Sequence, residues 1–230
     1  LAKLALPTIA AQLINMLYNI VDRIYIGHIP DTGAMALTGV GVCMPLIMII
    51  TAFAALVGNG GAPRATIFMG KNKKDDAEKI LANCFTMQIL LSIILTVVLL
   101  IWNRDFLLAF GASANTIEYA ASYMNIYALG TIFVQLTLGM NAFITAQGFA
   151  KEGMLSVLIG AIANIILDPI FIFGLHMGVR GAALATVISQ CCSCIWVISF
   201  LFGKRTTLRI RGKNMGLKAA YILPCLALGS

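Results

Sequence analysis

Six long apolar runs dominate this sequence, and each is long enough to cross a lipid bilayer as a helix. A bilayer requires about 20 consecutive, mostly apolar residues. The runs cover approximately residues 4–26, 35–57, 80–102, 119–145, 154–173 and 182–202. Hydrophobic residues make up 60% of the chain and charged residues 11%, against about 25% charged residues in a soluble domain. The sequence therefore predicts an all-α, polytopic membrane protein with a six-helix transmembrane bundle.

A basic segment and a seventh apolar run follow these six. We expect residues 1–203 to form the six-helix unit, residues 204–218 to form a cytoplasmic linker, and residues 219–230 to begin a seventh transmembrane helix. The linker is basic through Lys204, Arg205, Arg209, Arg211, Lys213 and Lys218. Because the sequence opens on Leu1 and closes inside an apolar run, we expect it to be a fragment of a longer protein.

The positive charges predict the orientation in the membrane. If the N-terminus is cytoplasmic, thirteen Lys and Arg residues lie in inner segments, seven before the linker and six within it. Only Arg104 and Arg180 then lie in outer connections, while Arg23 lies within the first run. This excess of cytoplasmic positive charge follows the positive-inside rule. It accounts for the net charge of +7 without a nucleic-acid partner, and favours a multi-pass protein of the cell membrane.

The fifth run contains two polar side chains that a membrane helix does not need for spanning. Asn164 and Asp168 are four residues apart, so they share one face of a helix. An Asp at the centre of a membrane costs about 2.5–3.5 kcal/mol on insertion scales, and such residues usually face a bundle interior or a wet cavity. Pro169 follows directly and removes a backbone hydrogen bond, which predicts a kink beside Asp168.

The first run carries a second polar face. Its members recur every three or four residues, namely Gln12, Asn15, Asn19 and Asp22. Tyr18 lies one turn before Asp22, and Arg23 could pair with Asp22 or extend to the interface. If the outer ends of these two helices lie near His28 and Gly174, Asp22 and Asp168 are each six residues before the end, or roughly 9 Å from that edge. We therefore expect both acids to share one polar site, which could exchange protons or bind a hard cation such as Na⁺.

Other patterns restrict the class of protein. The segment 57–63 is rich in glycine but lacks the Lys-Ser/Thr ending of a phosphate-binding loop, so we expect a close-packed turn or a helix–helix contact. The six cysteines all lie in or beside apolar runs and have no His at metal-ligand spacing, which favours packing roles. No catalytic Ser-His-Asp, Cys-His or metal-ligand arrangement is present, so we predict neither an enzyme nor a bound cofactor.

Several ordered motifs resemble the multidrug and toxic compound extrusion (MATE) family. The first run combines Pro7 with Tyr18 and Asp22, and the second is followed by Gly-Gly-Ala-Pro63. The later motifs are Asn141 with Ala-Gln147-Gly, Ala-Asn164-Ile-Ile-Leu-Asp168-Pro169 and Gly181-Ala-Ala-Leu-Ala-Thr186. The resemblance covers essentially the whole chain. It implies the N-terminal lobe of a twelve-helix transporter, in which the C-terminal lobe of the same polypeptide supplies the other half.

The resemblance also implies roles for single residues. Members of the family use residues that correspond to Asp22, Asp168, Asn164, Asn141 and Thr186 in coupling to H⁺ or Na⁺. Protonation in the family bends the first helix near Pro7. We expect the substrate to contact a second set of residues, Tyr18, Asn15, Asn19 and Gln135. Asp22 and Asp168 would be the ligands if the coupling ion is Na⁺.

The leading hypothesis is a cation-coupled (H⁺ or Na⁺) multidrug efflux antiporter that exports amphipathic, cationic organic compounds. The alternative is a lipid-linked saccharide flippase of the same superfamily. A flippase would have to bind a pyrophosphate, and Arg23 is its only candidate intramembrane cation. We therefore favour the antiporter.

Overall fold

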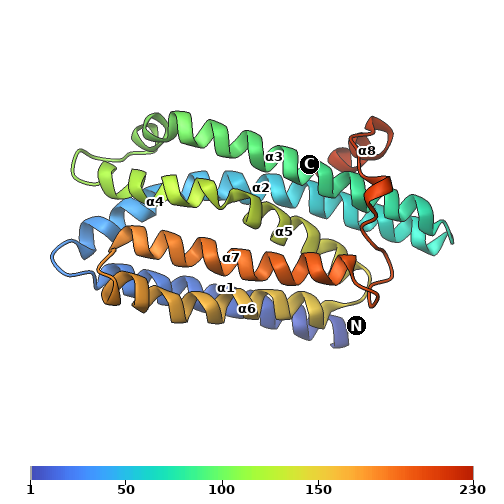
Figure 1. Cartoon of the computed structure of the whole chain (residues 1–230), viewed down its shortest axis with the longest axis horizontal. Coiled ribbons are helices and arrows are strands. Elements are labelled where there is room, and N and C mark those ends of the chain that lie inside the picture. The colour runs from blue at the N-terminus through green and yellow to red at the C-terminus, as the bar shows by residue number, and fades with distance from the viewer. Residues whose placement is uncertain (1, 230) are drawn as a thin grey trace.

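The computed structural model describes residues 2–229 and shows a bundle of long helices (Figure 1). Their order is α1 (Ala2–Gly27), α2 (Gly33–Gly70), α3 (Lys74–Ala109), α4 (Ile117–Leu129), α5 (Thr131–Ala146), α6 (Ala150–Pro169), the π-helix η1 (Ile170–Gly174), α7 (Val179–Phe202), the 3-10 helix η2 (Gly212–Asn214) and α8 (Ala219–Gly229). The prediction of an all-α fold is confirmed. Leu1 and Ser230, which bound the expected first and last segments, lie outside the described residues.

Most of the helices are suited to a membrane. Helices α2, α3, α6 with η1, and α7 are each long and apolar enough to span it, and the bent pair α4 and α5 would form a fifth span. Helix α1 is not among them, because its polar stripe interrupts the apolar run. Its 26 residues nevertheless reach about 39 Å, and it packs along α6. We therefore retain it as the sixth span.

The chain ends and connections divide between the two ends of the bundle. The N-terminus, the α2–α3 and α5–α6 connections and α8 all lie at the right-hand end of Figure 1. The α1–α2, α3–α4 and α6–α7 connections lie at the opposite end. The right-hand end therefore carries the basic segments that the sequence assigns to the cytoplasm.

The glycine-rich segment 57–63 is helical. It lies inside α2, which continues through Pro63 to Gly70, so the alternative of a turn is wrong and the helix–helix contact is correct. A Cβ atom on Gly58 would lie 2.9 Å from the carbonyl oxygen of Gly139 in α5. Small residues allow the backbones of membrane helices to approach this closely, and the gain in packing offsets the low helix propensity of glycine.

The fourth apolar run, expected as one helix, is broken at Gly130 into α4 and α5. The two parts are bent by 58°. A Cβ atom on Gly130 would lie 2.5 Å from Cγ2 of Val187 in α7, so only glycine lets α7 pack against the break. Both halves of the run pack against α2, α3 and α7, and the second half also packs against α6.

The basic linker is packed against the bundle by buried polar side chains. The carboxylate of Glu78, 1% exposed, forms an ion pair with the Arg211 guanidinium, with 2.8 Å between Glu78 Oε2 and Arg211 Nε. The Gln147 side-chain oxygen accepts hydrogen bonds from Leu208 N at 2.7 Å and from the Thr206 hydroxyl at 2.9 Å. The linker therefore has defined contacts with α3 and with the α5–α6 connection.

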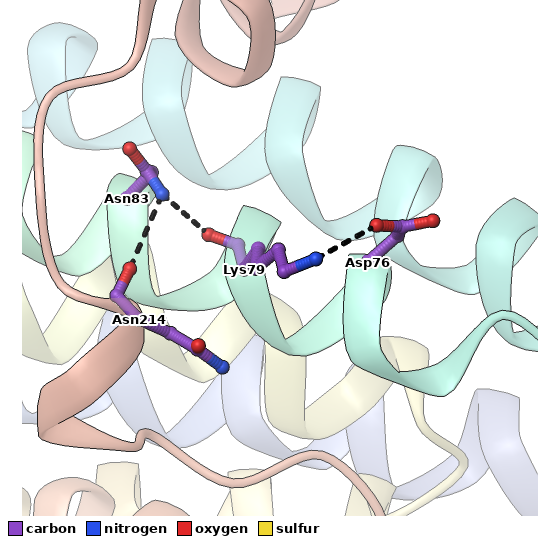
Figure 2. A network of polar contacts seen from close by, with 4 residues as sticks. All are labelled: Asp76, Lys79, Asn83 and Asn214. Carbon is purple, nitrogen blue, oxygen red and sulfur yellow. Dashed lines mark hydrogen bonds and ion pairs between the residues drawn. The ribbon is translucent and has the colours of Figure 1, made fainter.

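Asn83 provides the third attachment point of the linker (Figure 2). Its Nδ2 donates to Lys79 O at 2.8 Å and to Asn214 O at 3.4 Å, and its Oδ1 accepts from Lys218 N at 2.8 Å. The same view shows Lys79 paired with Asp76 at 3.3 Å on the exposed side of α3. Asn83 is 1% exposed, so water cannot replace these bonds.

We predict that Asn83→Ala destabilises the docked linker. The change leaves Lys218 N without its side-chain acceptor, which should lower the free energy of unfolding by about 1–3 kcal/mol. Limited trypsin digestion of the purified full-length transporter should cut faster after Lys213 and Lys218. Lys79→Met is the matched control, because it removes only an exposed ion pair of small value. Equal digestion rates for wild type and Asn83→Ala would contradict the prediction.

Candidate functional site

A cavity of about 220 Å³ lies inside the bundle, bounded by α1, α2, α4, α5, α6 and α7. Helix α1 contributes a polar wall. Five of its residues line the cavity, namely Asn15, Tyr18, Asn19, Asp22 and Arg23. The opposite walls include Asn164 of α6 and Thr186 of α7, together with apolar side chains of α2. This combination of polar groups and apolar walls suits an organic ligand that carries a polar or charged part.

Two carboxyl groups meet beside this cavity. The side chains of Asp22 on α1 and Asp168 on α6 interact directly, and Asp168 is completely buried. The Asn164 Nδ2 donates to Asp168 Oδ1 at 3.3 Å, which the four-residue spacing on one helix allows. The lengthwise packing of α1 on α6 places the two acids at the same depth.

Three oxygen atoms at this pair lack a hydrogen-bond donor. They are Asp22 Oδ1, Asp168 Oδ2 and Asn164 Oδ1, all buried and without a partner among residues 2–229. Buried polar atoms are normally paired, so such a group of unpaired acceptors requires explanation. A proton shared by the carboxyl groups, or a hard cation held by the oxygens, would satisfy them. Within the described part of the chain there is no group of three or more His, Cys, Asp or Glu that could hold a metal ion.

The backbone changes its winding directly after Asp168. Pro169 ends α6, and the chain continues as the π-helix η1, in which Leu175 N donates to Ile170 O. Proline lacks an N–H and leaves a carbonyl of the preceding turn without its helical partner. Helix α1, in contrast, runs as one α-helix through Pro7.

Two tyrosines of α4 were not identified by the sequence analysis. The rings of Tyr123 and Tyr127 are stacked, with centroids 6.1 Å apart and an interplanar angle of 16°, and both line the cavity. Tyr123 also interacts with Asp22 and with the Thr186 side chain. The four-residue spacing of two tyrosines in a membrane run was the available signal.

Six of the nine predicted substrate and coupling residues line this cavity, Asp168 lies beside it, and two lie elsewhere. Tyr18, Asn15, Asn19, Asp22, Asn164 and Thr186 line it. Gln135 instead is completely buried, and its Nε2 donates to Ile50 O of α2 at 2.8 Å. In this structure Gln135 ties α5 to α2 and does not line the cavity, and its expected substrate contact stays a prediction.

Asn141 also lies apart from the carboxyl pair. Its Nδ2 donates to Gly153 O at 3.3 Å, near the start of α6. Asp168 is fifteen residues further along the same helix, which is roughly 22 Å. The structure therefore places Asn141 away from the carboxyl pair, at the connected ends of α5 and α6, and its role in coupling stays a prediction.

A partly polar cavity between membrane-spanning helices is typical of a transporter, and the comparisons with known proteins agree. The family model described as MatE matches residues 7–170, so the chain belongs to the MatE family. It is not a family of enzymes. The chain is 30% identical over 210 residues to multidrug export protein MepA of Staphylococcus haemolyticus (strain JCSC1435), covering 91% of this chain and 46% of that protein.

Further relatives give the same picture. MepA of Staphylococcus aureus (strain NCTC 8325 / PS 47) is 27% identical over 198 residues, which is 85% of this chain and 43% of MepA. The chain thus spans less than half the length of these curated relatives. Its fold matches solved MATE structures over half of their length, which confirms the prediction of the N-terminal lobe of a MATE-type transporter.

Two of these structures were solved in different conformations. A multidrug resistance MATE family transporter of the MOP superfamily in the outward-facing conformation has a TM-score of 0.90 and 27% identity, over 99% of this chain and 50% of that chain. The inward-facing conformation has a TM-score of 0.86 and 27% identity, over 96% and 52%. A MATE structure in complex with MaD3S has a TM-score of 0.91 and 27% identity, over 99% and 51%.

We predict that Gly160→Val weakens the wall of the cavity. The new side chain would overlap the Ser193 hydroxyl of α7, which donates to Ser156 O at 2.8 Å. Overpacking of this kind costs about 1–3 kcal/mol. The thermal midpoint of the purified full-length protein should fall, whereas Gly41→Val should change it little, because a Cβ atom on Gly41 meets nothing within 4 Å. Equal shifts in both variants would refute this account.

Proposed function

We propose that the complete transporter is a cation-coupled multidrug efflux antiporter of the cell membrane, which exports amphipathic organic cations in exchange for H⁺ or Na⁺. The observation that carries this proposal is the pair Asp22 and Asp168, with unpaired buried oxygens next to a cavity of suitable polarity. The family relationship supports drug export, since two relatives are multidrug export proteins.

Each residue has a distinct role in this scheme. Asp22 and Asp168 bind the coupling ion, and the Asn164 amide orients Asp168 through its hydrogen bond. Thr186 orients Tyr123, whose phenol ring is close to Asp22. Tyr18 and Tyr123 offer aromatic faces to the positively charged part of a substrate, because a cation is attracted to the face of such a ring.

Exchange follows because the cationic substrate and the coupling ion compete for the same negatively charged carboxylates. A cationic substrate is stabilised by the ionised pair, and it is released when a proton or sodium ion neutralises the same carboxylates. One charge that crosses a potential of 100 mV supplies about 2.3 kcal/mol, so the ion gradient can drive export without a nucleotide. A bend of α1 at Pro7 would accompany ion binding and change the shape of the cavity.

The surroundings of the site complete the proposal. The C-terminal lobe and membrane lipid are the expected partners, with the N-terminus in the cytoplasm. A lipid-linked saccharide flippase is less consistent with the cavity, because Arg23 is its one basic lining side chain among the described residues. A pyrophosphate normally requires several such groups.

The direct test measures ethidium transport by the full-length protein in vesicles, with proton and sodium gradients imposed separately. Export that follows one gradient and stops when that gradient is collapsed identifies the coupling ion. Transport that is independent of both gradients would refute an antiporter.

We predict that Asp168→Asn abolishes ethidium export at normal expression. The amide keeps the shape of the side chain, but it cannot carry the negative charge that the exchange requires. Asp105→Asn is the matched control, because Asp105 is an exposed acid at the end of α3. Undiminished export by Asp168→Asn would exclude the carboxyl pair as the coupling site.

A further inference from the structure

Arg23 places a positive charge on the wall of the cavity directly after Asp22 in the chain. It lines the cavity and also a shallow apolar groove formed by α1 and the start of α2, with Ile20, Ile24 and Leu37. Its side chain is exposed. This single residue therefore connects the polar interior of the lobe to its surface.

The guanidinium group has no acceptor within the part of the chain that the structure describes. Among the described residues, Arg23 forms no ion pair within 4 Å, and its charge acts on Asp22 only at longer range. The Asp22 side chain interacts with Asp168 instead. Side chains at positions i and i+1 of a helix point in different directions, so Asp22 contacts Asp168 of α6 while Arg23 lines the cavity and the groove.

An unpaired guanidinium within a membrane-spanning segment is unfavourable, and such groups normally have an anionic partner. The planar guanidinium presents several N–H donors that match the two oxygens of a carboxylate. Asp22 and Arg23 together thus offer adjacent binding positions of opposite charge. A ligand that carries a cationic and an anionic group would satisfy both positions.

We propose that Arg23 forms an anion subsite of the substrate cavity and selects zwitterionic compounds with a carboxylate. The substrate carboxylate binds the Arg23 guanidinium, while its cationic part lies between Asp22 and the tyrosines of α1 and α4. The proposal deepens the proposed efflux function and rests on it. Arg23 is then a specificity-determining residue, separate from the ion-coupling pair.

The test uses two dyes that differ in one functional group. Rhodamine 123 is the methyl ester of rhodamine 110, so only rhodamine 110 has a free carboxylate. The full-length transporter and its Arg23→Gln variant are compared for export of each dye from cells. We expect Arg23→Gln to reduce the ratio of rhodamine 110 to rhodamine 123 export at least about tenfold, which corresponds to 1.4 kcal/mol. Arg23→Lys should restore part of the ratio, because it keeps the charge but loses the bidentate geometry.

Control variants separate a specific effect from a general loss of function. Arg180→Gln removes an exposed arginine at the start of α7 and should leave the ratio unchanged. In the wild type, rhodamine 110 should inhibit rhodamine 123 export competitively. This last experiment needs no variant, so it remains informative if Arg23→Gln does not fold.

Two results would overturn the subsite. The first is an unchanged export ratio in Arg23→Gln, which is expected if a lipid phosphate or an acid of the C-terminal lobe pairs with Arg23. The second is an equal loss of export of both dyes in this variant. Failure of the coupling proposal gives a different pattern. In that case Asp168→Asn still exports both dyes, while Arg23→Gln still changes their ratio.

Discussion

The contact between Asp22 and Asp168 constrains the whole bundle. Two carboxyl groups inside a membrane are each costly, and they can persist only where they share a partner and a polar cavity. Their contact requires α1 and α6 to pack lengthwise in one register. It also requires α4 and α7 to close the site, which they do through the stacked tyrosines and Thr186. The cavity is therefore a consequence of where the acids lie along two helices.

The remaining helices are held by close backbone approach and by buried polar ties. Gly58 meets Gly139 where α2 crosses α5, and the Gln88 amide donates to Ala54 O at 3.0 Å. In a membrane there is little hydrophobic gain between helices, so small residues and interhelical hydrogen bonds supply much of the association. Gln135 belongs to this group of ties. A polar residue in a membrane helix can thus serve packing as well as transport.

Buried polar contacts also hold the linker at the end of the bundle. Three of its backbone N–H groups donate to side-chain oxygens of Glu78, Gln147 and Asn83, which lie in or beside the membrane helices. Helix α8 then packs against α2, where Gly60 leaves room for the carbonyl of Cys225. The first segment beyond the linker is consequently attached to the helix bundle.

The sequence alone determined the helical class, the apolar spans and the alignment of Asn164 with Asp168, because these depend on composition and on the local 3.6-residue period. It also predicted that Asp22 and Asp168 would lie at equal depth, since the rise per residue is constant. Only the tertiary structure decided which polar side chains reach the cavity. The break at Gly130, the turning of Gln135 and Asn141 toward other partners and the tyrosine wall all depend on how neighbouring helices pack, and that packing is not encoded in the period of any single run.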